Sequence, residues 1–315
     1  MAILPMEIMK ESALLPKPLR GIIPPVVTPL TEIDQLDHAS LEKLIEHLIE
    51  GGVHGLFLLG TTGGAPALSY RLRKELVERA CAQVAGRVPV LVGVSDSSYT
   101  ECHAMATHAA DAGADAVVVA SPFYFSMSQT DLYRWVSRLA QQTALPLYLY
   151  NMPGLTKAWF EPETVARLAE LPSILGLKDS SADLDYLARV KATMADRPDF
   201  ALLVGPEELL CQTLRMGTHG GVCGGANLFP RPFTALYAAS VAGDWQRAEQ
   251  LQQTILAMGR LLYGIGEPQS SYLRGLLLGM ELLGLAKSLP PFPYAPIDSR
   301  KHADLAQRLK DLCGM

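Results

Sequence analysis

Lys178 stands at the end of a predicted buried strand, where its amine could act as a nucleophile. It directly follows the apolar run 174–177, in what should be a buried strand. Lysine is rarely buried, because removing an ammonium group from water is costly. One interpretation is that its methylene chain carries the charge from the strand end out to solvent. The other is that burial favours the neutral amine, which can attack a ketone carbonyl and form a Schiff base.

Two further features stand at the ends of apolar runs. Tyr150 closes the run 145–150 and is either a packed aromatic or, beside a Schiff-base lysine, a group that passes protons. The segment Gly60-Thr61-Thr62-Gly63-Gly64 is either a tight connection or a cradle for a carboxylate, built from N–H groups and hydroxyls. A phosphate is less favoured, since no Gly-Lys-Ser/Thr follows.

The elements that must position these residues are short apolar runs alternating with amphipathic segments. The runs lack hydrophobic/polar alternation, which is typical of strands buried on both faces of a parallel sheet. Helix starts are predicted at Thr100-Glu101 and Ser128-Gln129, and stops at Gly51-Gly52 and Gly113. The predicted strands are 21–27, 55–59, 88–94, 116–120, 145–150, 174–177, 200–204 and 220–223.

Eight strand–helix repeats predict an α/β chain folded as a closed (β/α)8 TIM barrel. The open Rossmann alternative lacks its Gly-x-Gly-x-x-Gly fingerprint after the first strand. From about residue 245 the strands stop, and 251–262, 270–283 and 302–312 are predicted as appended C-terminal helices. The expected organisation is an extension over 1–20, a barrel over 21–244 and a C-terminal helical region over 245–315. In such a barrel chemistry sits at the C-terminal ends of the strands.

Composition excludes several classes of partner. The net charge is −5 with a pI of about 5.8 and no dense Lys/Arg run, so neither nucleic acid nor an anionic membrane surface is expected. No apolar run reaches the ~20 residues of a membrane span, and the N-terminus does not resemble a signal peptide. The 5 cysteines are dispersed, which favours reduced thiols and a cytoplasmic protein.

Other chemistries are weakly supported. The histidines include no His-x-x-x-His pair at strand ends, and there is no cysteine cluster, so no metal is expected. A serine nucleophile is disfavoured because Gly-x-Ser-x-Gly is absent. His103 and His108 are expected on a helix.

Taken in order, five strand-end motifs resemble the dihydrodipicolinate synthase / N-acetylneuraminate lyase family of pyruvate-dependent class I aldolases. The resemblance runs from about Gly21 to the C-terminus, and the combination of motifs is far more specific than any one of them. The motifs are Gly60-Thr61-Thr62-Gly63, Ser121-Pro122-Phe123-Tyr124, Tyr150-Asn151-Met152-Pro153, Gly176-Leu177-Lys178-Asp179 and Gly225-Ala226-Asn227.

The resemblance implies a mechanism without metal or other cofactor. Lys178 would form the imine with a 2-oxo acid, Tyr150 would be the general acid/base, and Thr61 would relay protons. Tyr124 would complete the relay from a neighbouring subunit, in a homotetramer built as a dimer of dimers. The substrate carboxylate would be held by Thr61, Thr62 and the Gly63 turn, and the main-chain carbonyl near Val222 would face the pyruvyl group.

Departures from the family's pattern concern the substrate. Synthase members carry an Arg two residues after the Pro of Tyr-Asn-x-Pro, where it binds the carboxylate of the aldehyde; here that position is Leu155. Without a bidentate guanidinium, an aspartate-semialdehyde-like partner loses its anchor. Gly64 also replaces the usual Glu, and Ser121 and Phe123 depart from the common Thr-Pro-Tyr-Tyr form.

We therefore expect a lyase that cleaves or forms a C–C bond with pyruvate as the imine partner. Leu155 and the sequence Lys178-Asp179-Ser180-Ser181 resemble the 2-keto-3-deoxy sugar acid aldolases and the sialic acid lyases of the family more than its true synthases. This resemblance implies a 2-keto-3-deoxy sugar acid or a 4-hydroxy-2-oxo acid as the substrate. Alternatives on the same scaffold are dihydrodipicolinate synthase, N-acetylneuraminate lyase and a sugar-acid dehydratase. The alternative from another class is a non-catalytic protein that binds a 2-oxo acid.

Overall fold

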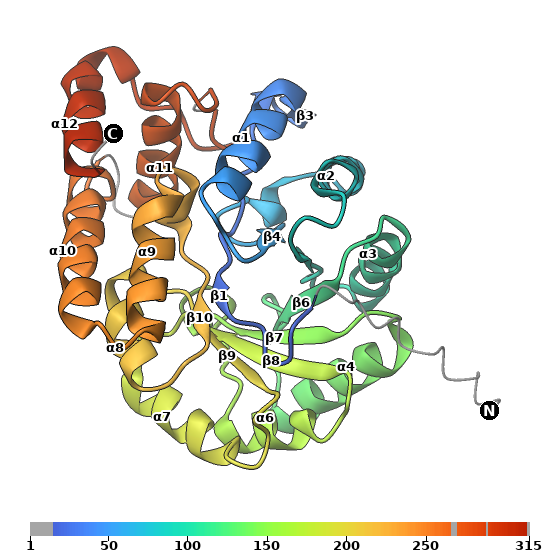
Figure 1. The fold of residues 1–315 in the computed structure, drawn as a ribbon. Helices are drawn as coiled ribbons and strands as arrows, with labels where there is room; N and C mark the ends of the chain where they lie inside the picture. The colour runs from blue at the N-terminus through green and yellow to red at the C-terminus, as the bar shows by residue number, and fades with distance from the viewer. Residues whose placement is uncertain (1–14, 266–269, 288, 314–315) are drawn as a thin grey trace.

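The computed structural model describes residues 15–265, 270–287 and 289–313. Its centre is a sheet of eight parallel strands in the order β1-β10-β9-β8-β7-β6-β5-β4 (Figure 1). The strands are β1 (Gly21–Ile22), β4 (Leu56–Leu58), β5 (Val90–Gly93), β6 (Ala116–Ala120), β7 (Leu147–Asn151), β8 (Ile174–Asp179), β9 (Ala201–Val204) and β10 (Gly220–Gly221).

The sheet closes into a barrel where the two strands at the ends of this order, β1 and β4, meet. Beyond β1, Pro25 forms a parallel bridge with Phe57 of β4. The Phe57 N–H donates to the Pro24 carbonyl at 2.9 Å, and its carbonyl accepts from Val26 N–H at 2.8 Å. The predicted TIM barrel is confirmed. Regular pairing of β1 is shorter than the predicted 21–27, because Pro24 and Pro25 have no N–H to donate.

Helices cover the outside of the barrel. They are α1 (His38–Glu50), α2 (Tyr70–Val84), α3 (Tyr99–Asp111), α4 (Gln129–Gln142), α5 (Pro153–Thr156), α6 (Pro162–Ala169), α7 (Leu184–Thr193), α8 (Leu210–Arg215) and α9 (Pro230–Val241). Single turns of 3-10 helix occur at η1 (Ala65–Ala67), η2 (Glu207–Leu209), η3 (Gly224–Asn227) and η4 (Ser299–His302).

Side chains of the strands alternate between two apolar layers. The outward-facing residues, such as Leu147 and Leu149 of β7, join the large cluster under the helices. The inward-facing residues, such as Tyr148 and Tyr150, form a second cluster inside the barrel. Leu19 is fully buried in this inner cluster, together with Leu15. The described part of the N-terminal extension therefore contributes apolar side chains to the barrel interior.

Serine caps decide where two of the helices begin. Ser128 accepts from Asp131 N–H, and α4 begins at Gln129, within the predicted start. α3 begins at Tyr99, one residue before the predicted start, because the Ser98 side chain accepts from Glu101 N–H at 3.4 Å.

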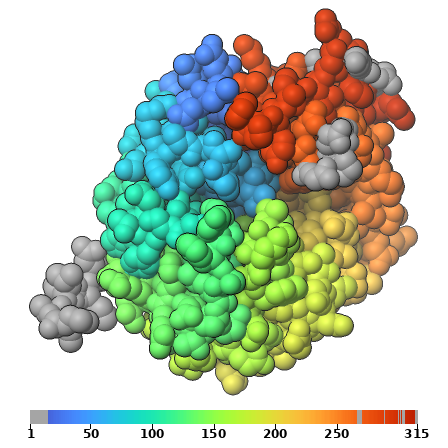
Figure 2. Space-filling view, turned by 180° about the vertical axis from the view of Figure 1, so that it is seen from behind, coloured from blue at the N-terminus to red at the C-terminus, as the bar shows by residue number. Residues whose placement is uncertain are grey.

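Three helices follow the barrel: α10 (Trp245–Leu262), α11 (Ser271–Leu282) and α12 (Ala303–Cys313). α10 begins earlier than the predicted 251 because Asp244 caps it, accepting from Arg247 N–H at 3.0 Å. In Figure 2 the red C-terminal segment lies directly beside the blue surface formed early in the chain. The Lys43 ammonium donates to the Gly284 carbonyl across this junction.

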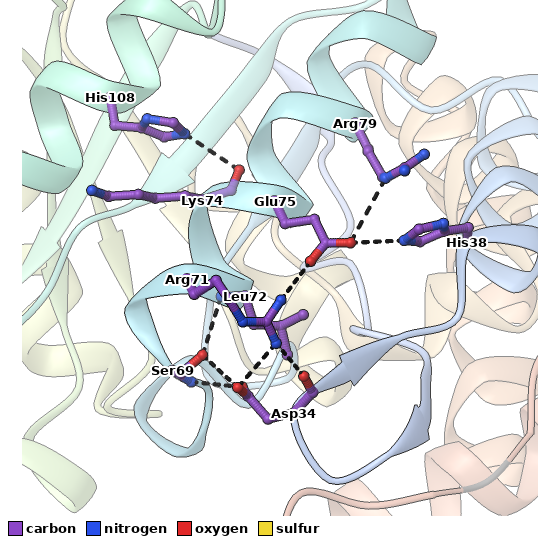
Figure 3. Close-up of polar contacts among 9 residues, drawn as sticks. All are labelled: Asp34, His38, Ser69, Arg71, Leu72, Lys74, Glu75, Arg79 and His108. Atoms are coloured by element: carbon purple, nitrogen blue, oxygen red, sulfur yellow. Dashed lines mark hydrogen bonds and ion pairs between the residues drawn. The ribbon is translucent and has the colours of Figure 1, made fainter.

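A hairpin between β1 and α1 is attached to α2 by a polar network (Figure 3). The hairpin strands are β2 (Leu30–Glu32) and β3 (Gln35–Leu36). The Asp34 carboxylate accepts from Ser69 N–H at 3.0 Å and from the Arg71 guanidinium at 3.1 Å. Arg71 also donates to Glu75 at 2.9 Å, and the Glu75 carboxylate lies 2.8 Å from His38 Nε2. These contacts hold the first βα connection against the start of α2.

Candidate active site

Lys178 lies inside the barrel near the C-terminal end of β8. Only 5% of its surface is exposed. Its Nζ lies 4.0 Å from the centre of the Tyr150 ring and 5.0 Å from that of Phe57. β8 continues through Lys178 and Asp179, beyond the predicted end at 177, because both residues pair with β7 and β9. The amine is thus held by a strand, beside two aromatic rings and largely shielded from solvent.

Tyr150 is the direct neighbour of Lys178 across the sheet, because the two residues are paired in the β7–β8 register. Its hydroxyl lies 3.2 Å from Thr61 Oγ1. Burial alone would raise the pKa of Tyr150, but the Lys178 charge and hydrogen bonds with Thr61 and Ser180 outweigh it, so the pKa lies below its usual range. A phenol of lowered pKa beside an amine can both give and take a proton.

The loop after β4 has an unusual backbone conformation, and glycines at two positions make room for it. Leu59 enters it with φ of 57°, a left-handed conformation that is strained for a leucine. A Cβ on Gly93 would meet the Leu59 carbonyl oxygen at 2.3 Å, so the glycine permits this close approach. A Cβ on Gly63 would meet the Val26 carbonyl oxygen at 2.9 Å. The Gly63 carbonyl in turn accepts from the Thr28 hydroxyl at 2.8 Å.

This loop has the properties of an anion cradle. Within the described ranges, no protein group accepts a hydrogen bond from the amides of Thr61, Thr62 and Gly63. The Thr62 side chain is buried, and its Oγ1 lies 3.1 Å from the Tyr272 hydroxyl of α11. Consecutive free amides with a hydroxyl beside them can hold a carboxylate.

Two buried asparagines from the quoted motifs join the strand ends. Asn151 donates to the Asp179 carboxylate at 2.8 Å, one residue beyond the Tyr150–Lys178 pair. Asn227 donates to the Pro25 carbonyl at 2.9 Å and accepts from Val27 N–H at 3.1 Å. Asn151 therefore joins β7 to β8 beside Lys178, whereas Asn227 joins the segment after β10 to the segment after β1.

Ser180 belongs to the same group of side chains, although the sequence did not single it out as a site residue. Its hydroxyl is near enough to Tyr150 to help lower the pKa of that phenol, and it occupies space left by Gly205, where an added Cβ would lie 2.0 Å from Ser180 Oγ. The signal in the sequence was its position two residues after Lys178, which places successive inward side chains on one face of an extended segment.

The other predicted site residues have fewer contacts with Lys178 and Tyr150. Val222 is buried and lines, with Lys178 and Tyr148, a cavity of about 10 Å³ inside the barrel, near the least that holds one water. Leu155 lies on α5 and is 55% exposed. Tyr124 is 79% exposed, and its ring packs edge-on against Phe125 at 5.1 Å. Its predicted role depends on a neighbouring subunit and stays a prediction.

Among the residues that the structure describes, no group of three or more His, Cys, Asp or Glu side chains could hold a metal ion. Over the same residues, none of the helices is both long enough and apolar enough to span a membrane. His103 and His108 lie on α3, as predicted.

A buried amine next to a phenol and a threonine, at the C-terminal end of a closed barrel, defines a Schiff-base lyase of the class I aldolase type. The model of the dihydrodipicolinate synthetase family matches residues 18–312, and the chain belongs to this family. Its members are lyases, and the predicted enzyme class is confirmed.

Individual relatives agree with this assignment. The chain is 35% identical over 296 residues to 4-hydroxy-tetrahydrodipicolinate synthase of Methanopyrus kandleri, covering 93% of this chain and 96% of the relative. The structure of dihydrodipicolinate synthase from Bacteroides thetaiotaomicron is similar with a TM-score of 0.90 and 46% identity, covering 93% and 99% of the two chains. The structure of YagE from E. coli K12, a prophage protein of the same family in complex with pyruvate, has a TM-score of 0.87 and 33% identity, covering 93% and 98%.

Proposed function

We propose that the protein is an aldolase that joins pyruvate to, or releases it from, an aldehyde through an imine on Lys178. The observation that carries the proposal is the paired position of Lys178 and Tyr150, with Nζ 4.0 Å from the centre of the phenol ring and the hydroxyl 3.2 Å from Thr61. An amine, a proton carrier and a hydroxyl relay are the groups that imine formation requires.

In the cleavage direction, the Lys178 amine passes its proton to the Tyr150 phenolate and then adds to C2 of the 2-oxo acid. Tyr150 gives a proton to the carbinolamine oxygen, which leaves as water and produces the iminium. The phenolate then removes the proton of the C4 hydroxyl, the C3–C4 bond breaks, and its electron pair enters the iminium to form the enamine. An aldehyde leaves, Tyr150 protonates C3, and water hydrolyses the pyruvyl imine. The lowered pKa of Tyr150 suits this alternation between phenol and phenolate.

The free amides of Thr61, Thr62 and Gly63 would hold the carboxylate of the 2-oxo acid, and Thr62 would add its hydroxyl. The carboxylate would then lie on the β4 loop, with C2 directed at Lys178. The main-chain carbonyl near Val222 would face the pyruvyl group. Holding both reactants in this way converts a bimolecular step into a local one.

For the aldehyde half we propose a hydroxylated substrate, a 2-keto-3-deoxy sugar acid or a 4-hydroxy-2-oxo acid. Leu155 offers no charge to a second carboxylate, whereas Ser180 offers a hydroxyl beside Tyr150. The second candidate is dihydrodipicolinate synthase, favoured by the activity named for two of the relatives above. Leu155→Arg tests the role of this position. Activity with aspartate semialdehyde should rise in the variant, and an unchanged rate would count against the role that we give to Leu155.

We further propose that no metal takes part and that the protein is a homotetramer in which Tyr124 of one subunit completes the relay of its neighbour. The exposed pair Tyr124 and Phe125 supports a partner at this place, because large aromatic surfaces are usually covered. Activity that survives treatment with a chelator would support a mechanism without metal. A mass of one chain, measured by light scattering, would contradict the homotetramer.

The decisive experiment is borohydride reduction in the presence of pyruvate, followed by intact-mass measurement. Wild type should gain one reduced pyruvyl group, and Lys178→Ala should gain none. Folded wild type that forms no adduct with pyruvate or with larger 2-oxo acids would refute the imine mechanism. An adduct without turnover over a broad panel of aldehydes and sugar acids would favour the binding protein. An intact carbon chain in the product would indicate a dehydratase.

A further inference from the structure

Tyr272 connects the appended helices to the cradle of the active site. It lies in the first turn of α11, and its hydroxyl is 3.1 Å from Thr62 Oγ1. The close fit depends on Gly224 of η3, where an added Cβ would lie 1.6 Å from the Tyr272 hydroxyl oxygen. Any side chain at 224 would displace this phenol, so the contact with Thr62 depends on the glycine at this position.

The chemistry of the two hydroxyls decides the direction of the hydrogen bond. Each carries one proton, and a phenol is the stronger donor. Burial raises the pKa of Tyr272 far above its usual value, so the phenol keeps its proton. Among the described side chains, Thr62 is the only acceptor within hydrogen-bond distance of this hydroxyl. When Tyr272 donates to Thr62, the proton of Thr62 is free to point elsewhere.

We propose that Tyr272 is a positioning residue that donates to Thr62 Oγ1 and thereby directs the Thr62 proton at the substrate carboxylate. The proposal rests on the function proposed above, because it needs a 2-oxo acid in the β4 loop. It assigns to the C-terminal helices a part in substrate binding that the barrel strands cannot supply.

A second contact places the same region against the same loop. Gly64 has φ of 67°, and a Cβ there would lie 2.7 Å from Cγ of Pro291, in the connector between α11 and η4. The β4 loop is therefore in contact with the C-terminal region at Thr62 and at Gly64. Its shape depends on residues more than 200 positions away in the sequence.

The test compares Tyr272→Phe with Tyr263→Phe. Both variants lose one buried phenol hydroxyl from the same aromatic pair, whose ring centres are 4.8 Å apart. Tyr263, however, donates to Glu207 and not to Thr62. Borohydride trapping is measured over a range of concentrations of pyruvate and of methyl pyruvate, which has the ketone but no carboxylate. Near-UV circular dichroism of each variant verifies that the aromatic packing is kept.

For Tyr272→Phe, the half-saturating pyruvate concentration should rise about fivefold to twentyfold, the effect of weakening one hydrogen bond to a charged group. The maximal trapping rate and the methyl pyruvate curve should stay as in wild type, and Tyr263→Phe should leave both curves in place. In a Thr62→Val background, Tyr272→Phe should add nothing. An unchanged pyruvate curve, or equal weakening of both ketones, overturns the proposal. Wild type without any adduct would instead be a failure of the imine mechanism itself.

Discussion

Glu207 is a buried carboxyl whose ionisation should make the protein less stable as pH rises. It lies in η2, after β9, with 7% of its surface exposed. The Gly225 N–H donates to one of its oxygens at 2.8 Å and the Tyr263 hydroxyl to the other at 2.7 Å. Burial raises its pKa from 4.5 to about 7 and outweighs both hydrogen bonds, which lower it; the nearby Glu208 raises it further.

The direction of the effect follows from proton binding. Between pH 4.5 and about 7 the folded protein keeps the Glu207 proton, whereas the unfolded chain has lost it. Stability is therefore greatest below pH 4.5 as far as this group is concerned, falls through the interval and is constant above it. A difference of about 2.5 pH units, at about 1.4 kcal/mol for each, gives about 3 kcal/mol.

Glu207→Gln removes the ionisation and preserves the shape. The amide oxygen can accept from Gly225 N–H, and the amide nitrogen can donate to the Tyr263 oxygen. The variant should match wild type near pH 4.5 and exceed it by about 3 kcal/mol at pH 8.5. Denaturant unfolding of both proteins at the two pH values measures this, and the difference between them cancels the other titrating groups. A gap of the same size at both pH values would refute the assignment of a raised pKa.

Three further outcomes can be measured on the same preparation. Tyr150→Phe should slow pyruvate adduct formation about 10²-fold to 10⁴-fold and leave Lys178 able to react, which rapid-quench mass spectrometry can follow; a wild-type rate would exclude general acid/base catalysis by this phenol. Tyr148→Phe should raise the free energy of unfolding by about 1–3 kcal/mol, because the Tyr148 hydroxyl is buried without a hydrogen-bond partner among the described residues; a clear loss of stability would reveal a water-mediated partner in the adjoining cavity. Asp34→Asn should destabilise by about 0.2–1 kcal/mol at neutral pH in low salt. The hydrogen bonds from Ser69 and Arg71 hold the pKa of Asp34 below its usual 3.8, so the difference from wild type should vanish as pH falls below that range; a difference that persists at pH 2.5 in thermal melts would contradict this.

The centre of the site could be predicted because a barrel brings all its strand ends to one place. Lys178, Tyr150 and Thr61 are distant in sequence, but each follows an apolar run, and parallel strands of a closed sheet present such ends at one face. The β7–β8 register then makes Tyr150 and Lys178 neighbours. Strand order and side-chain alternation were therefore enough to bring these three together.

The support of the site could not be predicted in this way. Tyr272 comes from a helix outside the eight repeats, and no periodicity relates its position to that of Thr62. Glu207 follows β9, just as other polar residues follow other strands, so its sequence position does not mark it. What distinguishes Glu207 is its burial beside Tyr263, which the sequence does not reveal. Leu15 and Leu19 lie in a segment whose prolines predict no regular element. In the structure both leucines pack in the apolar cluster inside the barrel.

The positions that depart from the family's pattern divide the active site into two halves. Lys178, Tyr150 and Thr61 keep the pattern, and two of them lie on strands fixed by pairing on both sides. Leu155 and Gly64 depart from it, and both lie on connections after strands, one on the exposed α5 and one against the C-terminal connector. A connection can change without moving the strands, because the hydrogen bonds of the barrel do not pass through it. Exchange of residues in these connections should therefore alter which aldehyde reacts, while the mass of the trapped pyruvate adduct and its dependence on Lys178 stay the same.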